Sequence, residues 1–312
     1  MSAARPRPLP AAALLAALLL GCGGGGASPA SPDLAGSNGG RARAPAGGVV
    51  TGSRVNISYG RHELQKFDFH HPLAGEPPHP LVIHLHEGAF VGGDKKLPPN
   101  QGLHRAIREA GAAVASANYR LAPEATFPEP ALDAARMVQY MRAHADTFQI
   151  DPDRIVLMGR SAGSVLAGWV TYGPDQADPD ATEPVLRQSS RPLAWVNFSG
   201  VTDFEAIKKT MECAYFGPET IYHADLQLIR DASPLHLALL WNASPPPSFS
   251  WYCGRKEPVP TNDPHNPVFG DMLEIALRSL GDTESVNVWS EIPGDDPPVE
   301  DVIAWLERVW GR

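Results

Sequence analysis

The sequence predicts an α/β domain in which a mostly parallel sheet is flanked by helices on both faces. Short apolar runs rich in Val and Ile alternate along the chain with segments of helical period. Strands that alternate with helices are joined by right-handed crossovers, which gives parallel strands with helices on the two faces of the sheet. The runs predicted as buried strands are residues 81–85, 113–117, 154–158, 193–197, 248–252 and 286–292.

Three segments carry apolar residues at alternating spacings of three and four, which puts those residues on one face of a helix. The predicted helices are residues 131–145, 269–280 and 299–310. Pro267 precedes the second helix and Gly281 follows it, as is typical of a helix start and a helix end. Alternating runs at residues 55–59 and 64–69 predict an antiparallel hairpin at the edge of the sheet.

The composition is that of a soluble globular protein. Hydrophobic residues make up 43% and charged residues 20% of the 312 residues, and the formal net charge is −9. Nucleic-acid binding calls for clustered Lys and Arg, and the sequence contains no block of five or six basic residues. The sequence therefore argues against a nucleic-acid partner.

The N-terminal residues have the pattern of a secretory signal. A short basic head precedes the apolar residues 11–20, which are too few to span a bilayer, where about 20 are needed. Residues 1–21 are therefore predicted to be a signal peptide. The stretch that ends in Cys22 resembles a bacterial lipoprotein box, which implies that Cys22 is lipidated; the alternative is an ordinary signal peptide with an incidental cysteine. We expect a protein of the bacterial cell envelope, attached to a membrane only by this lipid anchor, or secreted to the periplasm.

A low-complexity segment follows the signal. In residues 23–48, 21 of 26 positions are Gly, Ala, Ser or Pro, which cannot bury enough apolar surface to fold. We expect residues 22–48 to contain the lipidated cysteine and a flexible linker, and residues 49–312 to form the α/β domain. The remaining cysteines, Cys213 and Cys253, could pair or stay free.

One motif combines a strand, a sharp turn and a helix. The predicted strand at residues 154–158 runs into Gly159-Arg160-Ser161-Ala162-Gly163, a G-x-S-x-G pattern. This turn holds a serine in a strained conformation above the sheet, and the neighbouring glycines let the turn close. Ser161 is the predicted nucleophile, and the backbone N–H of Ala162 is a predicted oxyanion donor.

Several further blocks carry a family resemblance. The run His86-Glu87-Gly88-Ala89-Phe90 follows a predicted strand, and the later blocks are residues 93–95, 119–124, 127–128, 133 and 151–155. In these blocks the chain resembles the bacterial esterase branch of the α/β-hydrolase fold, related to hormone-sensitive lipase and feruloyl-esterase-like enzymes. The resemblance covers most of residues 50–310. It implies an α/β-hydrolase fold in which residues 201–244 form a small cap insertion; ordinary packing of helices and loops is the alternative for this region.

The resemblance also implies an oxyanion site. Gly88 and Ala89 would join Ala162 as backbone donors. Glu87 replaces a glycine of the family, and a carboxylate there opposes an oxyanion unless it is paired or points away. Arg160 is a second unusual residue: its cation could favour an anionic substrate or could pair with Glu87.

The positions of the catalytic acid and base match the family pattern less well than the serine and the oxyanion loop do. Glu257 falls where the family has its acid, although a surface loop glutamate is an equal interpretation. Pro297 stands where the family has its histidine. His265 is the one histidine after Glu257, and it is either a relocated base or a residue of the helix-entry loop. Asp296 and its neighbour Asp295 are weaker candidate bases.

The sequence thus predicts a serine esterase that acts on small esters without a cofactor. The alternative is a catalytically inactive hydrolase fold that binds a ligand or partner at the cell envelope, because a serine without a base is a poor nucleophile. His84 and His86 alternate along a strand near His70 and His71, but no converging carboxylates accompany them, so no metal is expected. No nucleotide-binding glycine motif occurs in the sequence.

Overall fold

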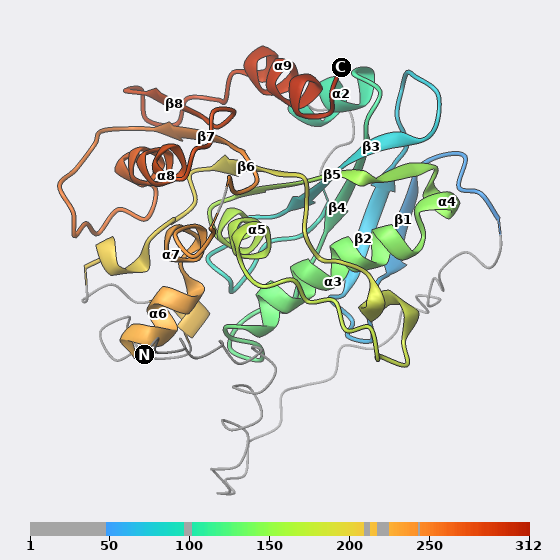
Figure 1. The fold of residues 1–312 in the computed structure, drawn as a ribbon, viewed down its shortest axis with the longest axis horizontal. Helices are drawn as coiled ribbons and strands as arrows, with labels where there is room; N and C mark the ends of the chain where they lie inside the picture. The colour runs from blue at the N-terminus through green and yellow to red at the C-terminus, as the bar shows by residue number, and fades with distance from the viewer. Residues whose placement is uncertain (1–47, 97–101, 209–212, 217–224, 243) are drawn as a thin grey trace, which may run out of the picture. The chain divides into compact units, whose positions relative to one another are not determined.

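The computed structural model describes residues 48–96, 102–208, 213–216, 225–242 and 244–312. The strands are β1 (Arg54–Ser58), β2 (Lys66–His70), β3 (His79–Leu85), β4 (Ala113–Ala117), β5 (Ile150–Arg160), β6 (Ala194–Phe198), β7 (Ser248–Cys253) and β8 (Val286–Ser290). They form one eight-stranded sheet in the order β1-β2-β4-β3-β5-β6-β7-β8 (Figure 1). β2 pairs antiparallel with β1 and β4, and the other pairs are parallel. The predicted sheet with its edge hairpin is confirmed.

Helices cover both faces of this sheet. The α-helices are α2 (Gly102–Glu109), α3 (Glu129–Ala143), α4 (Ala145–Phe148), α5 (Ala162–Tyr172), α6 (Leu226–Ala232), α7 (Pro234–Ala238), α8 (Val268–Ser279) and α9 (Val299–Val309). The described residues also form the short 3-10 helices η1 (Pro184–Arg187), η2 (Phe204–Ala206) and η3 (Ala214–Phe216). Figure 1 shows α2 and α9 on one side of the sheet, and α3, α5, α7 and α8 on the other. The layered α/β architecture agrees with the prediction.

The core consists of two apolar layers, one on each face of the sheet. Side chains alternate along a strand, so Ile83 packs into the layer under α3 and α5 while Val82 packs into the layer under α2 and α9. Strands covered on both faces read as continuous apolar runs, which is why the sequence pattern identified them. Trp305 on α9 is 2% exposed, so the C-terminal helix packs closely against the sheet.

The cap region is described in part. η2, η3, α6 and α7 lie between β6 and β7, where the small cap insertion was expected. The signal peptide, Cys22 and almost all of the linker lie outside the described residues, so lipidation and the anchor stay predictions. Across the described ranges, no helix is both long and apolar enough to cross a bilayer. Cys213 and Cys253 are not joined by a disulfide.

Candidate active site

The serine turn between β5 and α5 has the geometry of a nucleophile elbow. Ser161 has φ 49° and ψ −119°, a conformation that a non-glycine residue rarely adopts. A Cβ at Gly159 would lie 2.4 Å from the backbone of Gly163, and a Cβ at Gly163 would lie 2.2 Å from the carbonyl oxygen of Leu85. The two glycines are therefore required because backbone segments meet here without room for a side chain.

His265 lies beside this serine. It belongs to the loop between β7 and α8, and its Nε2 lies 2.9 Å from the Oγ of Ser161. The backbone N–H of His265 donates to Oδ1 of Asp263 at 2.9 Å, which fixes the turn that carries the imidazole. His265 as a residue is exposed to solvent, yet partial burial of its imidazole is the largest influence on its pKa and lowers it; Asp263 raises that pKa, Arg160 lowers it and Glu87 raises it. A neutral imidazole is thereby favoured at neutral pH.

The loop that carries His265 is held by Asn266, which the sequence analysis did not single out. Asn266 is fully buried, and its Oδ1 accepts from the backbone N–H groups of Glu257 and Val268, at 3.1 Å each. Its Nδ2 donates to the carbonyl oxygen of Glu257 at 2.9 Å. One amide side chain therefore joins the predicted acid position to the start of α8. No motif pattern marks a buried loop asparagine.

Glu257 lies on this loop but does not bond the imidazole. In the part of the chain that is described, its Oε2 accepts from Oγ1 of Thr261 at 3.1 Å, and no hydrogen bond joins it to His265. Thr261 Oγ1 in turn accepts from the backbone N–H of Asp263 at 3.0 Å. The carboxylate of Glu257 thus stabilises the turn through Thr261, while Asp263 is the carboxylate that raises the pKa of His265 most.

The loop after β3 supplies the predicted oxyanion donors. Gly88 and Ala89 have positive φ of 132° and 51°, and a Cβ at Gly88 would lie 2.1 Å from the carbonyl oxygen of Gly92. The hydroxyl of Tyr119 donates to the carbonyl oxygen of His86 at 2.8 Å, which holds the start of the loop. Within the described ranges, the backbone N–H groups of Gly88, Ala89 and Ala162 have no hydrogen-bond acceptor. Open N–H donors at small residues are what an oxyanion requires.

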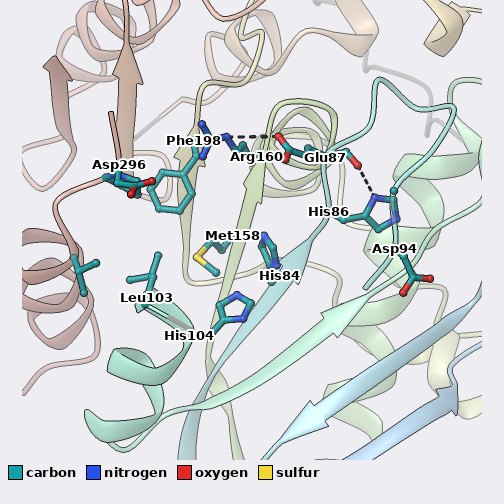
Figure 2. Close-up of a pocket in the computed structure, with 14 residues that line it drawn as sticks. His84, His86, Glu87, Asp94, Leu103, His104, Met158, Arg160, Phe198 and Asp296 are labelled. Carbon is teal, nitrogen blue, oxygen red and sulfur yellow. Dashed lines mark hydrogen bonds and ion pairs between the residues drawn. The ribbon is translucent and has the colours of Figure 1, made fainter. Parts of the chain in front are cut away.

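The two unusual charges pair with each other. Nε of Arg160 lies 3.5 Å from Oε2 of Glu87, and Figure 2 shows the two side chains facing one another between the elbow and the oxyanion loop. The Arg160 side chain stays 40% exposed and that of Glu87 63% exposed. An ion pair that is this exposed to solvent contributes little free energy. The guanidinium of Arg160 therefore remains available to other groups.

A cavity of about 700 Å³ lies beside this ion pair, between the sheet and the starts of α2 and α9 (Figure 2). Its lining includes His84, His86, Glu87, Asp94, Leu103, His104, Met158, Arg160, Phe198, Asp296, Pro297 and Val299. We call it the histidine pocket. The loop after β8 contributes Asp296 and Pro297 to the lining of this pocket. This loop therefore brings no histidine to Ser161. No pattern in the sequence indicates this pocket, because its lining comes from segments far apart in the chain.

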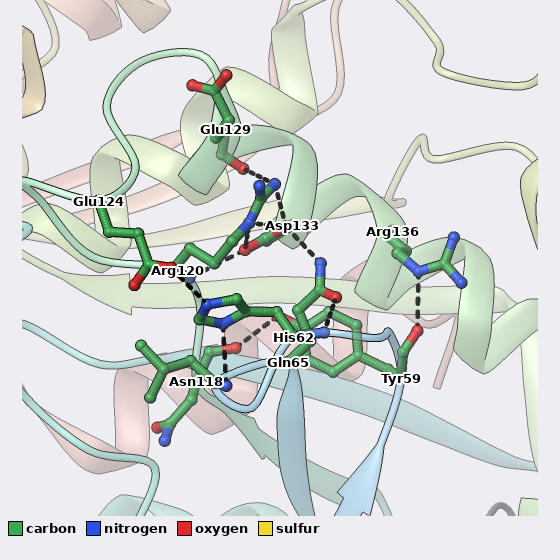
Figure 3. Close-up of polar contacts among 10 residues, drawn as sticks. Tyr59, His62, Gln65, Asn118, Arg120, Glu124, Glu129, Asp133 and Arg136 are labelled. Atoms are coloured by element: carbon green, nitrogen blue, oxygen red, sulfur yellow. Dashed lines mark hydrogen bonds and ion pairs between the residues drawn. The ribbon is translucent and has the colours of Figure 1, made fainter. Parts of the chain in front are cut away.

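A buried polar network supports the segment between β4 and α3. The carboxylate of Asp133 accepts from Nε and Nη2 of Arg120, from the backbone N–H of Arg120, and from Nε2 of Gln65 (Figure 3). The Asp133 side chain is 2% exposed, so its charge is compensated almost entirely by these donors. This network ties the hairpin, the loop after β4 and α3 together. The network accounts for the polar residues Arg120 and Asp133 in two of the sequence blocks that resemble the esterase family.

One cluster of potential metal ligands occurs among the described residues, away from His84 and His86. Asp203, Glu205 and His236 place one ligand atom each within 4.8 Å of one another. His236 Nε2 lies 3.1 Å from Asp203 Oδ1, and Arg230 donates to Glu205 at 2.7 Å. Glu205 thus has an ion-pair partner in Arg230, and Asp203 has a hydrogen-bonding partner in His236.

Part of the chain is similar in sequence to known ester hydrolases. The chain is 29% identical over 180 residues to the probable carboxylic ester hydrolase LipM of Mycobacterium tuberculosis, and 33% identical over 119 residues to the probable isoprenylcysteine alpha-carbonyl methylesterase ICMEL2 of Arabidopsis thaliana. These alignments cover 54% and 38% of this chain but span only 39% and 28% of those relatives.

Solved structures share the fold over a larger part of the chain. A carbohydrate esterase from gut microbiota, solved in truncated form, gives a TM-score of 0.70 at 18% identity and covers 86% of this chain and 99% of that one. A bacterial heroin esterase gives 0.60 at 21% identity, with 84% and 85% covered. The predicted α/β-hydrolase fold is confirmed. The BD-FAE family model matches residues 67–246, more than half of the chain. The chain therefore belongs to the BD-FAE family of α/β-hydrolase esterases.

Proposed function

We propose that this protein hydrolyses small carboxylic esters with Ser161 as the nucleophile and His265 as the base. The observation that carries the proposal is the hydrogen bond of 2.9 Å between His265 Nε2 and Ser161 Oγ. A serine hydroxyl becomes a strong nucleophile only when a base is within hydrogen-bond reach. The relation to carboxylic ester hydrolases supports the same reaction class.

The reaction follows from the geometry. Ser161 Oγ attacks the ester carbonyl carbon while His265 Nε2 takes its proton, and the negative oxygen is held by the N–H groups of Gly88, Ala89 and Ala162. The intermediate collapses when the imidazolium returns the proton to the leaving alcohol, and an acyl-serine remains. Water then attacks the acyl-serine with His265 again as base, which releases the acid and restores the hydroxyl. No cofactor takes part in these steps.

Two carboxylates can support the imidazole in this proposal. Glu257 remains the candidate acid from its position in the sequence, and its contact with Thr261 stabilises the turn on which His265 sits. Asp263 accepts the backbone N–H of His265 and favours the imidazolium electrostatically. Stabilising the imidazolium that forms during attack is the role that a triad carboxylate has.

The test is hydrolysis of p-nitrophenyl acetate by the wild type, Ser161→Ala and His265→Ala. We expect kcat to fall by about 10³-fold or more in each variant, because nucleophile and base act as one unit. An organophosphonate probe labels Ser161 in the wild type and leaves Ser161→Ala unlabelled. Equal rates in all three proteins, with no labelling, would show that the fold is catalytically inactive and binds its ligand without reaction.

The membrane anchor belongs to the proposal as well. Lipidation of Cys22 would tether the domain to the bacterial cell envelope through residues 22–48, and the substrate would reach it there as a small molecule. Growth with labelled palmitate, followed by comparison with Cys22→Ala, tests this part. Label on the Cys22→Ala protein would contradict it.

A further inference from the structure

The cap region and the loop between β7 and α8 share a short stretch of parallel pairing. Ile207 in the cap region forms a parallel bridge with Thr261 in the loop. The backbone N–H of Lys208 donates to the carbonyl oxygen of Thr261 at 2.7 Å, and the N–H of Thr261 donates to the carbonyl oxygen of Ala206 at 2.9 Å. Thr261 is 1% exposed, so water is kept from both bonds. We call residues 206–208 the cap clamp.

The side chain of Thr261 extends this pairing toward the proposed base. Its hydroxyl accepts from the N–H of Asp263 at 3.0 Å and donates to Oε2 of Glu257 at 3.1 Å. Oδ1 of Asp263 accepts from the N–H of His265 at 2.9 Å, and Nε2 of His265 lies 2.9 Å from Oγ of Ser161. A continuous series of hydrogen bonds therefore runs from the cap clamp to the proposed nucleophile.

The cap clamp is itself fixed by contacts with the cap helices. The backbone N–H of Phe204, just before the clamp, donates at 3.0 Å to Oγ of Ser233, which lies between α6 and α7. Oε1 of Glu205 accepts from Nε of Arg230 on α6 at 2.7 Å. These contacts join the clamp to α6 and α7, so the position of the cap helices sets the position of the clamp.

The cap region also contacts the oxyanion loop. Tyr215 in η3 stacks on Phe90, with ring centroids 4.1 Å apart and an interplanar angle of 11°. Phe90 directly follows Ala89, one of the predicted oxyanion donors. The ring of Phe204 lies 6.1 Å from that of Tyr215. The cap region thus contacts both loops that meet at the serine turn, one through aromatic packing and the other through the clamp.

We infer that the cap clamp positions the proposed base, and that Thr261 is the positioning residue that transmits this restraint to His265. This inference rests on the proposed esterase function. Residues 255–260 of the same loop are exposed throughout, so they provide little packing to hold the imidazole. A displacement of about 1 Å at a reacting group costs up to about 100-fold in rate. The clamp supplies a restraint at the buried end of the loop, next to the turn that carries His265.

Lys208→Pro tests the clamp by removing one of its hydrogen bonds. Proline has no backbone N–H, so the bond to the carbonyl oxygen of Thr261 is lost. Ile207 has φ −87° and ψ 139°, which is the extended conformation that a residue before proline prefers. The Lys208 side chain is exposed, and Lys208→Ala removes it while keeping the N–H, which makes this variant the matched control.

The first readout is hydrolysis of p-nitrophenyl acetate, measured well below the unfolding transition. We expect Lys208→Pro to lower kcat about tenfold and to leave KM within about twofold, because the restraint acts on the base and not on ester binding. Lys208→Ala should keep the wild-type kcat. Thr261→Val keeps the backbone pairing but removes the hydroxyl, and it should also lower kcat about tenfold. Thr261→Ser restores the hydroxyl and should stay within about threefold of the wild type.

Hydrogen–deuterium exchange measures the restraint without relying on catalysis. The N–H groups of Asp263 and His265 both donate within the turn, so a peptide covering residues 257–266 reports on its opening. We expect this peptide to exchange about tenfold faster in Lys208→Pro than in Lys208→Ala, with exchange in α9 unchanged. Faster exchange in α9 as well would mean general destabilisation and would overturn the specific role of the clamp.

The two readouts separate this inference from the proposed function. If the wild type hydrolyses the ester no faster than Ser161→Ala does, the esterase function fails, and exchange alone decides whether the clamp holds the loop. If the wild type is active, the inference is overturned when Lys208→Pro matches Lys208→Ala in either kcat or the exchange of residues 257–266. A rise in KM alone would overturn it too, because the clamp would then shape the ester site instead of positioning the base.

Discussion

The imidazole of His265 reaches Ser161 from a loop that lies before the last strand of the sheet, with Nε2 2.9 Å from Oγ. The two residues are 104 positions apart in the chain, and β6, β7 and the cap region lie between them. A triad is defined by geometry and roles rather than by the place of its members in the sequence. With His265 as the proposed base, the loop after β8, which carries Pro297, needs no catalytic role.

The contact between the elbow and the oxyanion loop predicts the effect of Gly163→Ala. The new Cβ would lie 2.2 Å from the carbonyl oxygen of Leu85 and 2.5 Å from that of His86, so the backbone must separate. We expect a loss of about 3 kcal/mol in the free energy of unfolding, measured in urea, together with loss of esterase activity. Gly52→Ala meets its nearest atom at 3.8 Å and is the control. An active Gly163→Ala of wild-type stability would contradict the close contact.

The pKa of His265 predicts the acid limb of the pH profile. Only the neutral imidazole accepts the proton of Ser161, so kcat/KM should fall as the pH drops through the pKa of His265. Burial lowers that pKa from its ordinary 6.5, which puts the limb below pH 6.5. Arg160→Gln removes a cation that lowers the pKa and should move the limb to higher pH, and Glu87→Gln should move it to lower pH.

The control for these shifts is Arg54→Gln, which removes an equal charge from the far edge strand of the sheet. Its acid limb should coincide with that of the wild type. Shifts of the same sign in Arg160→Gln and Glu87→Gln would mean that His265 is not the group that titrates.

Much of this architecture could be predicted from the sequence because the signals are local. Buried strands appear as apolar runs, and Gly159 is required by its close contact with Gly163, on the other side of Ser161 in the same turn. The helix α2 was not predicted, although Leu103, Ala106 and Ile107 have helical spacing, because a helix of eight residues is too short for its period to stand out. The buried His104 and Arg108 also replace apolar residues on its covered face.

The parts of the site that depend on distant segments were harder to infer. The sequence left His265 as one of several candidate bases, because no local pattern says which loop reaches Ser161. It named Glu257 as acid from its position, whereas the contact of Glu257 with Thr261 depends on the folded loop. The histidine pocket combines side chains from β3, α2, β5, β6 and α9, so only the fold brings them together.

Asn266 is predicted to position His265 rather than to touch the substrate. Asn266→Ala removes the acceptor of the Glu257 and Val268 N–H groups and the donor to the Glu257 carbonyl, all in a buried site. We expect a loss of about 3 kcal/mol in the free energy of unfolding and a lower kcat with little change in KM, measured well below the unfolding transition. Asn242→Ala, at an exposed site, is the control. Unchanged stability and kcat in Asn266→Ala would exclude the positioning role.

The last prediction concerns the buried carboxylate of Asp133. Asp133→Ala leaves the Arg120 guanidinium and the Gln65 amide without their acceptor, and we expect a loss of about 4 kcal/mol in the free energy of unfolding. Exchange of both partners, in Arg120→Met with Asp133→Leu, should restore part of that loss, because no uncompensated charge is then buried. Asp180→Ala, at an exposed site, should unfold like the wild type in the same urea titration. If the double variant is less stable than Asp133→Ala, the ion pair itself stabilises the fold, and the desolvation argument fails.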